Sequence, residues 1–406
     1  MNPNQLSAEQ ILTKLVAFDT TSSGSNLALI EWVEAYLAPY KVHSERVNET
    51  NEHGVKKAAL LVRIGPAVEG GIVLSGHTDV VPVKDQQWTG GAGAETAFTL
   101  TERDGKLYGR GSADMKGFIA LALARVPQWV TLELKRPVWL ALSFDEEIGC
   151  KCAEPLAVEF TKHAIKPQLI IVGEPTLMDV VDEHKGIDSF ETIITGKEAH
   201  SSGPQLGVNA AYYMGELLAV LNGMTRVEKA KADAGSPYPT PYSTVHVGVA
   251  QSGTARNIIP KDAKIVWEVR PLPGVNVDEV LAPYHAAVEK FNAQIKAHFP
   301  ECGIVTHRLT HVHGLRKKTN AAYLSLATYL AGSNAPASAV SYATEGGAFG
   351  EQGFPTVICG PGSIDQAHGP DEFIARSQLE KGAAMMVRIG EVLVGERWDG
   401  QKVVET

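Results

Sequence analysis

Hydrophobic and polar positions divide the first 180 residues into alternating helical and extended segments. Ser7 and Gln10 form a capping-box pattern, apolar residues at helical spacing follow as far as Phe18, and a second helix is predicted over Leu27–Leu37. A helix rich in small residues is predicted over Gly117–Val126. Apolar runs of strand length occur at Ala58–Ile64, Gly71–Leu74, Val138–Phe144 and Leu169–Val172. This alternation predicts an α/β fold, with a mixed sheet flanked by helices on both faces.

The pattern changes after Asp182. Residues Ser189–Thr195 alternate between apolar and polar side chains, as in a strand with one solvated face. Further elements follow: a helix at Val208–Asn222, a polar Pro-rich stretch at Met224–Tyr242, strands at Ser243–Ala250 and Lys264–Val269, a helix at Val277–Ala297 and a strand at Ile304–Leu309. The order strand-helix-strand-strand-helix-strand predicts a ferredoxin-like α+β domain.

From about Thr319 the first pattern resumes. We predict a helix at Ala321–Ala331, a strand at Thr356–Cys359 and a closing helix at Ser377–Val394. The sequence therefore predicts one domain made of residues 1–182 and 314–406, with residues 183–313 inserted into it as a second domain.

Composition narrows the function classes. Lys and Arg number 37 against 46 Asp and Glu, which gives a net charge of −9 and argues against binding of nucleic-acid phosphates. The four cysteines include no C-x-x-C pair, so a disulfide scaffold and a thiolate zinc finger are excluded, and Cys150 and Cys152 are expected to be small buried thiols. The chain has neither a leader pattern nor an apolar run of about 18 residues, and we expect a cytoplasmic protein that does not bind membranes.

Two predicted strands lead into residues that suit a metal site. His77 and Asp79 follow the apolar run at Gly71–Leu74. They are two residues apart, and on an extended chain such residues face the same way. Asp79 can accept the second ring N–H of His77, although a pair that merely closes a loop is the alternative. Further on, Asp145, Glu146 and Glu147 end a buried strand, where adjacent acids repel one another unless a cation holds them. A solvated run of charges is the alternative there.

Three loops complete the candidate set. The Gly-rich loop Gly109–Gly117 lacks the spacing of a phosphate loop and carries Asp114, which either points into a crevice or caps the next helix. Glu174 follows a strand and a glycine. His368 lies in a turn before the last helix, whose N-terminus Asp371 or Glu372 is expected to serve. Taken singly, Glu174 and His368 are more often structural.

Taken together, these residues point to a pair of divalent ions. Two imidazoles and three carboxylates suit Zn²⁺ or Co²⁺, and five ligands are one too many for a single tetrahedral ion. They fit two ions that share Asp114, each also holding one histidine and one glutamate, with a hydroxide between the ions. Glu146 is then free to act as a general base beside its coordinating neighbour Glu147.

The motifs resemble, in order, those of the M20 family of co-catalytic zinc peptidases and deacylases. They are Gly76-His77-Thr78-Asp79, Gly111–Gly117, Asp145-Glu146-Glu147, Gly173-Glu174-Pro175 and His368. The resemblance spans nearly the whole chain. It implies a zinc-peptidase-like catalytic domain in residues 1–182 and 314–406, and a lid and dimerisation domain in residues 183–313.

The same resemblance implies a role for each residue. One Zn²⁺ or Co²⁺ ion is held by His77, Asp114 and Glu174, and the other by Asp114, Glu147 and His368. Asp79 supports a ligand, and Glu146 is the catalytic base and acid.

Four further residues resemble family positions near the substrate. His200 resembles a histidine that reaches across a dimer to the reaction oxyanion, although an exposed turn histidine is the alternative. Asn257 and Arg270 resemble substrate-binding positions, and the guanidinium fork suits a carboxylate, but Arg270 could equally pair with Glu268. Glu345 is a candidate for the substrate's side-chain ammonium, with an ordinary loop acid as the alternative.

Within the family, Phe18–Ser22, Ser25–Leu37 and Gly360–His368 resemble the members that hydrolyse N-acetyl-L-ornithine to acetate and L-ornithine in arginine biosynthesis. This implies a small-molecule substrate and a homodimer. A succinyl-diaminopimelate desuccinylase, an aminoacylase and a dipeptidase remain alternatives. So does a non-catalytic metal-binding protein, although a spare Glu146 argues against it. A nucleotide-binding protein is disfavoured because the Walker and G-x-G-x-x-G spacings are missing.

Overall fold

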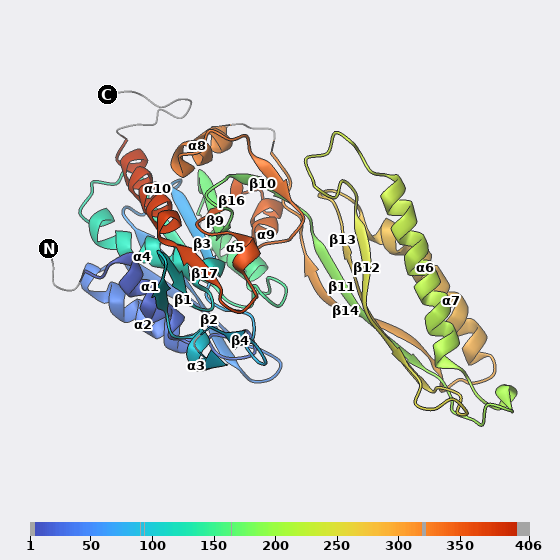
Figure 1. Cartoon of the computed structure of the whole chain (residues 1–406). Helices are drawn as coiled ribbons and strands as arrows, with labels where there is room; N and C mark the ends of the chain where they lie inside the picture. The colour runs from blue at the N-terminus through green and yellow to red at the C-terminus, as the bar shows by residue number, and fades with distance from the viewer. Residues whose placement is uncertain (1–4, 90, 93, 164, 319–321, 396–406) are drawn as a thin grey trace. The chain divides into compact units, whose positions relative to one another are not determined.

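The chain forms two compact units, shown in Figure 1. The computed structural model describes residues 5–89, 91–92, 94–163, 165–318 and 322–395. Unit 1 comprises Met1–Glu183, Leu315–Ala339 and Thr344–Thr406, and unit 2 comprises His184–Gly314 and Val340–Ala343. Each unit has a sheet and helices of its own, and each is described separately below.

Unit 1 is built on an eight-stranded sheet with the order β1-β2-β8-β3-β9-β16-β10-β15. Its strands are β1 (His43–Thr50), β2 (Lys56–Ile64), β3 (Ile72–His77), β8 (Val138–Ser143), β9 (Leu169–Pro175), β10 (Val181–His184), β15 (Ser338–Val340) and β16 (Thr356–Gly360). The neighbours from β8 to β16 run parallel, whereas β1 with β2, β2 with β8, and β10 with β16 pair antiparallel. The prediction of a mixed α/β sheet is confirmed.

Helices cover both faces of this sheet (Figure 1). One core contains α1 (Ala8–Val16), α2 (Leu27–Leu37), α4 (Gly117–Trp129), α8 (Ala322–Ala331) and α10 (Arg376–Val394). Leu60 and Val62 of β2 face this core, whereas the buried Leu61 between them points to the opposite face. On that face α5 (Ala153–Lys162) contacts α9 (Gly346–Glu351), and the rings of Phe160 and Phe349 stack with centroids 5.4 Å apart.

Short elements complete unit 1. They are η1 (Ala38–Tyr40), β4 (Gln87–Trp88), β5 (Gly91–Ala92), α3 (Ala94–Ala97), β6 (Thr101–Arg103), β7 (Lys106–Tyr108), η2 (Ser112–Lys116), η4 (Ile364–Gln366) and β17 (Phe373–Ala375). Strands β17, β7 and β6 form a small sheet of their own. The ladder between β17 and β7 therefore joins the segment after His368 to the segment before Asp114.

Unit 2 is a ferredoxin-like domain, as predicted. Its elements are β11 (Ile187–Thr195), η3 (Pro204–Leu206), α6 (Ala210–Ala230), β12 (Thr244–Ser252), β13 (Asp262–Arg270), α7 (Val277–Lys296) and β14 (Gly303–Val312). The antiparallel sheet has the order β12-β13-β11-β14. Both helices pack on one face of it, against a core that includes Phe190, Trp267 and Tyr284.

Helix α6 is longer than its sequence pattern predicts. The sequence predicts a helix that ends at about Asn222, followed by a polar, Pro-rich stretch from Met224, but the helix continues to Ala230. Leu221, Met224 and Glu228 are buried at helical spacing, so the inward-facing stripe extends through a segment of polar composition. The side chain of Asn209 accepts two backbone N–H groups at the other end and caps the helix there.

Two composition-based predictions concern the described residues. The four cysteines are free and buried, so the prediction for Cys150 and Cys152 is confirmed. In the part of the chain that the structure describes, no helix combines the length and the apolar composition that crossing a membrane requires.

Candidate metal centre

The strand ends of unit 1 converge at one edge of the large sheet. His77 is the last residue of β3, Glu174 is next to last in β9, and Glu146 and Glu147 follow the end of β8. Because β8, β3 and β9 are parallel neighbours, their carboxyl ends meet at the same edge. Asp114 reaches this edge from η2.

Asp114 lies between the two predicted histidine ligands. Its Oδ1 is 2.9 Å from Nε2 of His77, and its Oδ2 is 3.2 Å from Nε2 of His368. Glu147 Oε2 is 2.9 Å from Nε2 of His368, and Glu174 Oε1 is 3.7 Å from Nε2 of His77. The structure therefore brings all five predicted ligands together, with one oxygen of Asp114 on each side.

Two overlapping groups of ligand atoms occur at this edge. The groups are His77 with Glu146 and Glu174, and His77 with Asp114 and Glu147; in each, the ligand atoms lie within 4.8 Å of one another. Among the described residues, these are the groups of three or more potential ligands that are close enough to hold an ion. Glu146, expected to act as a base, thus also lies within reach of an ion.

The electrostatics of the cluster favour cations. Burial and the neighbouring carboxylates raise the pKa of Glu146 and Glu174 well above the ordinary value, and raise that of Glu147 to about 7. Glu174 is 4% exposed, and its Oε1 has no hydrogen-bond partner among the described residues. A buried carboxylate oxygen without a hydrogen-bond partner is costly, and a divalent cation would remove that cost. Imidazole and carboxylate donors suit Zn²⁺ and its neighbours, so the residues present fit a pair of such ions.

Asp79 joins the His77 strand to the loop of Glu146. The ring Nδ1 of His77 is 2.9 Å from the backbone oxygen of Asp79 and 3.6 Å from its carboxylate Oδ1. That carboxylate also accepts hydrogen bonds from the backbone N–H groups of Glu146 and Glu147 and from the hydroxyl of Ser22, the last at 2.6 Å. Burial by itself lowers the pKa of His77, but hydrogen bonds to Asp114 and Asp79 outweigh it and hold that pKa well above its usual range. Asp79 thus orients the ligand strand and the base loop together.

The sequence does not predict two contacts near Glu146, a hydrogen bond from a thiol and a buried ion pair. The thiol of Cys150 donates to Glu146 Oε1 across 3.4 Å. Lys57 and Asp145 form an ion pair with both side chains buried, and the same ammonium donates to the backbone oxygen of Ser22 at 2.6 Å. These contacts restrain the loop that follows β8. The local sequence around Lys57 contains no pattern that predicts the ion pair.

The alternative role of Asp114 as a helix cap is wrong. Helix α4 begins after Lys116, with no side-chain hydrogen bond at its N-terminus, because both oxygens of Asp114 face the histidines. Gly111 has φ +80°, which a residue with a Cβ rarely adopts, and this allows the turn that aims Asp114 inward. The peptide bond between Asp114 and Met115 is cis.

The expected roles of Asp371 and Glu372 are also wrong. Helix α10 begins at Arg376, after Ala375, with no side-chain cap. Asp371 instead accepts hydrogen bonds from Thr89, including its backbone N–H at 2.8 Å. Glu372 is buried and turns toward the Asp114 loop, since the short strand β17 separates it from the helix.

Glu345 is completely buried. One of its oxygens accepts a hydrogen bond from the hydroxyl of Ser75 in β3 at 3.4 Å, and burial raises the pKa of Glu345 to about 7. The residue precedes α9 and faces the sheet. Contact between Glu345 and a substrate ammonium stays a prediction.

His200 and Asn257 lie on adjacent loops of unit 2. His200 pairs with Ile258 in an isolated bridge, and the backbone N–H of Ser201 donates to the Asn257 oxygen at 3.1 Å. The backbone N–H of Ser202 donates to Nδ1 of His200 at 3.2 Å, so the neutral ring carries its proton on Nε2. His200 is exposed, and its Nε2–H is therefore a donor at the surface of unit 2.

Arg270 lies at the end of β13 in the same unit. Its Nε donates to Glu268 Oε1 at 2.7 Å, so the pairing considered from the sequence does form. The two side chains are about 30% exposed, which leaves the guanidinium reachable from solvent.

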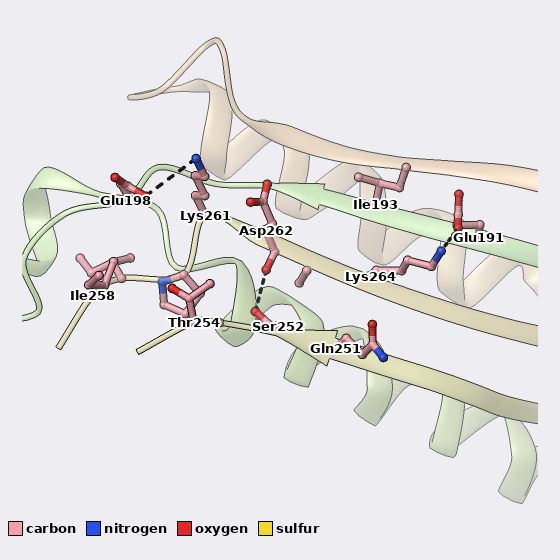
Figure 2. Close-up of a pocket in the computed structure, with 14 residues that line it drawn as sticks. Glu191, Ile193, Glu198, Gln251, Ser252, Thr254, Ile258, Lys261, Asp262 and Lys264 are labelled. Carbon is pink, nitrogen blue, oxygen red and sulfur yellow. Dashed lines mark hydrogen bonds and ion pairs between the residues drawn. The ribbon is translucent and has the colours of Figure 1, made fainter. Parts of the chain in front are cut away.

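A cavity of about 430 Å³ lies beside the His200 and Asn257 loops (Figure 2). Ile258 lines it, and four of its five charged side chains form ion pairs, Glu198 with Lys261 and Glu191 with Lys264. The fifth charged residue of the wall is Asp262. Because most of these charges are matched within the wall and a single carboxylate is left over, the cavity offers no set of convergent groups that identifies a ligand.

Comparison with known proteins relates the chain to one family. The model of peptidase family M20/M25/M40 matches residues 73–391. An acetylornithine deacetylase from Proteus mirabilis strain HI4320 is 34% identical over 380 residues, which cover 92% of each chain. Two solved structures share the fold. An M20 family metallo-carboxypeptidase from Sulfolobus solfataricus has a TM-score of 0.71 at 17% identity, covering 97% of this chain and 100% of the other. A dinuclear metal-binding peptidase of the M20 family from Bacillus subtilis has a TM-score of 0.60 at 12% identity, with 95% and 97% covered.

Proposed function

The chain belongs to peptidase family M20/M25/M40, and from this premise we propose that it is a two-metal deacetylase acting on N-acetyl-L-ornithine, with acetate and L-ornithine as products. Family membership and the ligand clusters indicate a metal-dependent amidohydrolase. The choice of substrate is supported by the 34% identical relative, which is an acetylornithine deacetylase.

The position of Asp114 between His77 and His368 is the observation that carries the two-metal proposal. His77, Asp114 and Glu174 would hold one ion, and Asp114, Glu147 and His368 the other. When bound, two such ions lower the pKa of a water molecule and polarise the acyl carbonyl. We propose Zn²⁺ or Co²⁺, because the donors are imidazole and carboxylate rather than thiolate.

Glu146 is the residue that we propose moves the proton. Its Oε1 accepts from the thiol of Cys150, which leaves Oε2 to take a proton from the attacking water. The same oxygen then delivers the proton to the departing α-amine. Asp79 holds the backbone of Glu146 and the ring of His77, so the base and one ligand are aligned by a single carboxylate.

Four residues outside the ligand set are proposed to bind the substrate. His200 carries a proton on Nε2 and can donate it to the oxygen of the acyl group as negative charge develops there. Arg270 offers a guanidinium for the substrate carboxylate, in exchange for its present partner Glu268. Asn257 and Glu345 are proposed as further contacts, and Glu345 would meet the side-chain ammonium.

A substrate comparison on the purified protein tests the proposal. After metal analysis, the rates on N-acetyl-L-ornithine, N-succinyl-L,L-diaminopimelate and a dipeptide are measured with added Zn²⁺ or Co²⁺. We expect two ions per chain and the highest kcat/KM on N-acetyl-L-ornithine. A preference for the succinyl substrate or the dipeptide would retain the metal centre but reject the substrate. A protein that binds no divalent ion would reject the mechanism.

The homodimer implied by the family resemblance is also proposed. Light scattering of the purified protein gives the molar mass. A value of about twice the monomer mass supports a dimer, and the monomer mass contradicts it.

A further inference from the structure

Arg110 and Glu372 form a buried ion pair next to the candidate metal centre. Arg110 Nη1 is 2.7 Å from Glu372 Oε2, and both side chains are 1% exposed. Two buried charges cost free energy unless they are paired and further hydrogen bonds satisfy their other polar atoms. Each member of this pair has such bonds, which lead to two different loops, and Nε of Arg110 is the atom left without a hydrogen-bond partner among the described residues.

Glu372 holds the loop that carries Asp114. Its Oε1 accepts the backbone N–H groups of Ala113 and Asp114, at 2.9 and 3.1 Å, and its Oε2 accepts that of Gly111 at 3.0 Å. These three bonds fix the backbone of the turn from Gly111 to Asp114. The Glu372 carboxylate therefore fixes the position of Asp114 in the candidate metal centre.

Arg110 holds the loop that carries His368. Its Nη2 donates to the backbone oxygens of His368 and Gly369, at 3.3 and 3.2 Å, and to the side-chain oxygen of Gln86 at 2.7 Å. Gln86 in turn donates to the same His368 oxygen at 2.9 Å. His368 has φ +66°, a backbone conformation that a residue with a side chain adopts only when its surroundings enforce it. Arg110 and Gln86 supply that restraint.

We propose that Arg110 and Glu372 are positioning residues that fix Asp114 and His368 relative to each other, and so set the affinity of the ion held by Asp114, Glu147 and His368. The inference rests on the proposed metal centre and goes beyond it by assigning a role to a pair outside the ligand set. His77 and Glu174 lie on β3 and β9 and receive no hydrogen bond from either residue of the pair in the described structure. Loss of the pair is therefore expected to affect one ion more than the other.

Cobalt titration of the metal-free full chain tests the inference, with binding followed by calorimetry and by the visible absorption of Co²⁺. For the wild type we expect two binding steps. Arg110→Lys keeps the charge but cannot reach Glu372, Gln86 and both carbonyls at once. We expect it to weaken the second step about tenfold or more, the range for residues that support metal ligands. The first step should weaken less, because Asp114 is the one ligand of that ion that the pair holds. Excess Co²⁺ should restore kcat without a change in KM.

Two further variants control for stability. Gln86→Ala removes a partly exposed side chain that also binds His368, and is expected to weaken the second step less than Arg110→Lys does. Arg388→Lys makes the same exchange at a half-buried arginine that donates to Leu330 in the same unit, and should bind both ions as the wild type does.

Wild-type affinity for both ions in Arg110→Lys and Gln86→Ala overturns the inference. So does an equal weakening of both steps in Arg110→Lys and Arg388→Lys, which would reflect general destabilisation. If Arg110→Lys does not fold, Gln86→Ala decides between the two results. A wild type that binds fewer than two ions rejects the proposed function as well, whereas a two-ion wild type with unaffected variants rejects the inference alone.

Discussion

Glu146 is the residue whose replacement most directly separates catalysis from metal binding. Glu146→Gln keeps the shape of the side chain but removes the oxygen that accepts the proton. We expect kcat to fall by about 10²–10⁴-fold, the usual contribution of a general base, with metal content and melting temperature close to wild type. Cys150→Ala is the matched control, because it removes the thiol contact and leaves the carboxylate in place. A Glu146→Gln protein with nearly full activity would remove Glu146 from the mechanism.

The burial of His184 should make the free energy of unfolding depend on pH. Burial lowers the pKa of His184 from 6.5 to about 4, so the folded ring stays neutral where the unfolded ring is already protonated. This contribution to stability is fully present above pH 6.5 and is lost as the pH falls from 6.5 toward 4, by about 3 kcal/mol in total.

Urea unfolding of the wild type and of His184→Asn, at pH 7.5 and at pH 5, isolates that contribution from other titrating groups. Asparagine can keep a donor toward the Lys185 oxygen that the ring Nδ1 now contacts at 2.8 Å. The free energy of unfolding should fall more steeply with acid in the wild type than in the variant. Parallel pH dependences would show that His184 is not the group responsible.

For single residues, the sequence predicts the metal-ligand candidates that lie at the ends of buried strands. His77, Glu147 and Glu174 follow apolar runs, and parallel strands bring such ends together. Arg110 and Glu372 are 262 positions apart, so no local pattern announces their pairing. The burial of Glu345 likewise depends on a sheet face that its own loop sequence does not reveal.

At the level of elements, β9 and α4 approach each other so closely that a glycine is required. A Cβ on Gly173 would lie 2.1 Å from Cγ of Phe118, whose ring is buried in α4. Gly173→Ala should therefore lower the free energy of unfolding by about 1–3 kcal/mol and displace Glu174, the next residue. Thermal unfolding and metal content measure the two effects.

Gly215→Ala is the contrasting variant for that prediction. Gly215 lies within α6, and nothing is within 4 Å of its added Cβ, so alanine should stabilise the helix by about 0.5–1 kcal/mol. If both alanine variants change stability in the same direction, close packing at Gly173 is not the cause.

Elements that bury a face can be predicted from their pattern, and elements that do not are missed. The apolar run at Ala58–Ile64 identifies β2, whereas its neighbour β1 has no fully buried residue and reads HSERVNET. Strand β1 is held by backbone pairing with β2 at the edge of the sheet, a contact that leaves no hydrophobic alternation. The extension of α6 was missed because Glu228 lies on its buried stripe.

On the scale of the whole molecule, the metal centre belongs to one unit. All five predicted ligands lie in unit 1, and the chain enters and leaves unit 2 through adjacent strands, with Ile187 opposite Val312. Chelation should therefore lower the melting temperature of the full chain, because crowded carboxylates lose their cations. The excised segment His184–Gly314 has its own core and should unfold at a temperature that chelator leaves unchanged. Calorimetry with and without chelator measures both.

Either of two results would contradict this division. One is a full chain whose transition stays the same after verified removal of metal. The other is an excised segment that chelator destabilises. The sequence predicts the inserted fold because the order of its strands and helices along the chain matches one known motif, but it does not predict the strand order of the large sheet.

That order has a consequence for synthesis on the ribosome. Strand β16, at Thr356–Gly360, lies between β9 and β10, which are made nearly two hundred residues earlier. Until β16 emerges, the growing polypeptide holds two strand edges with unpaired backbone groups, which invite aggregation. The amino-terminal half must therefore wait, shielded or only loosely collapsed, for a segment translated near the end of the message.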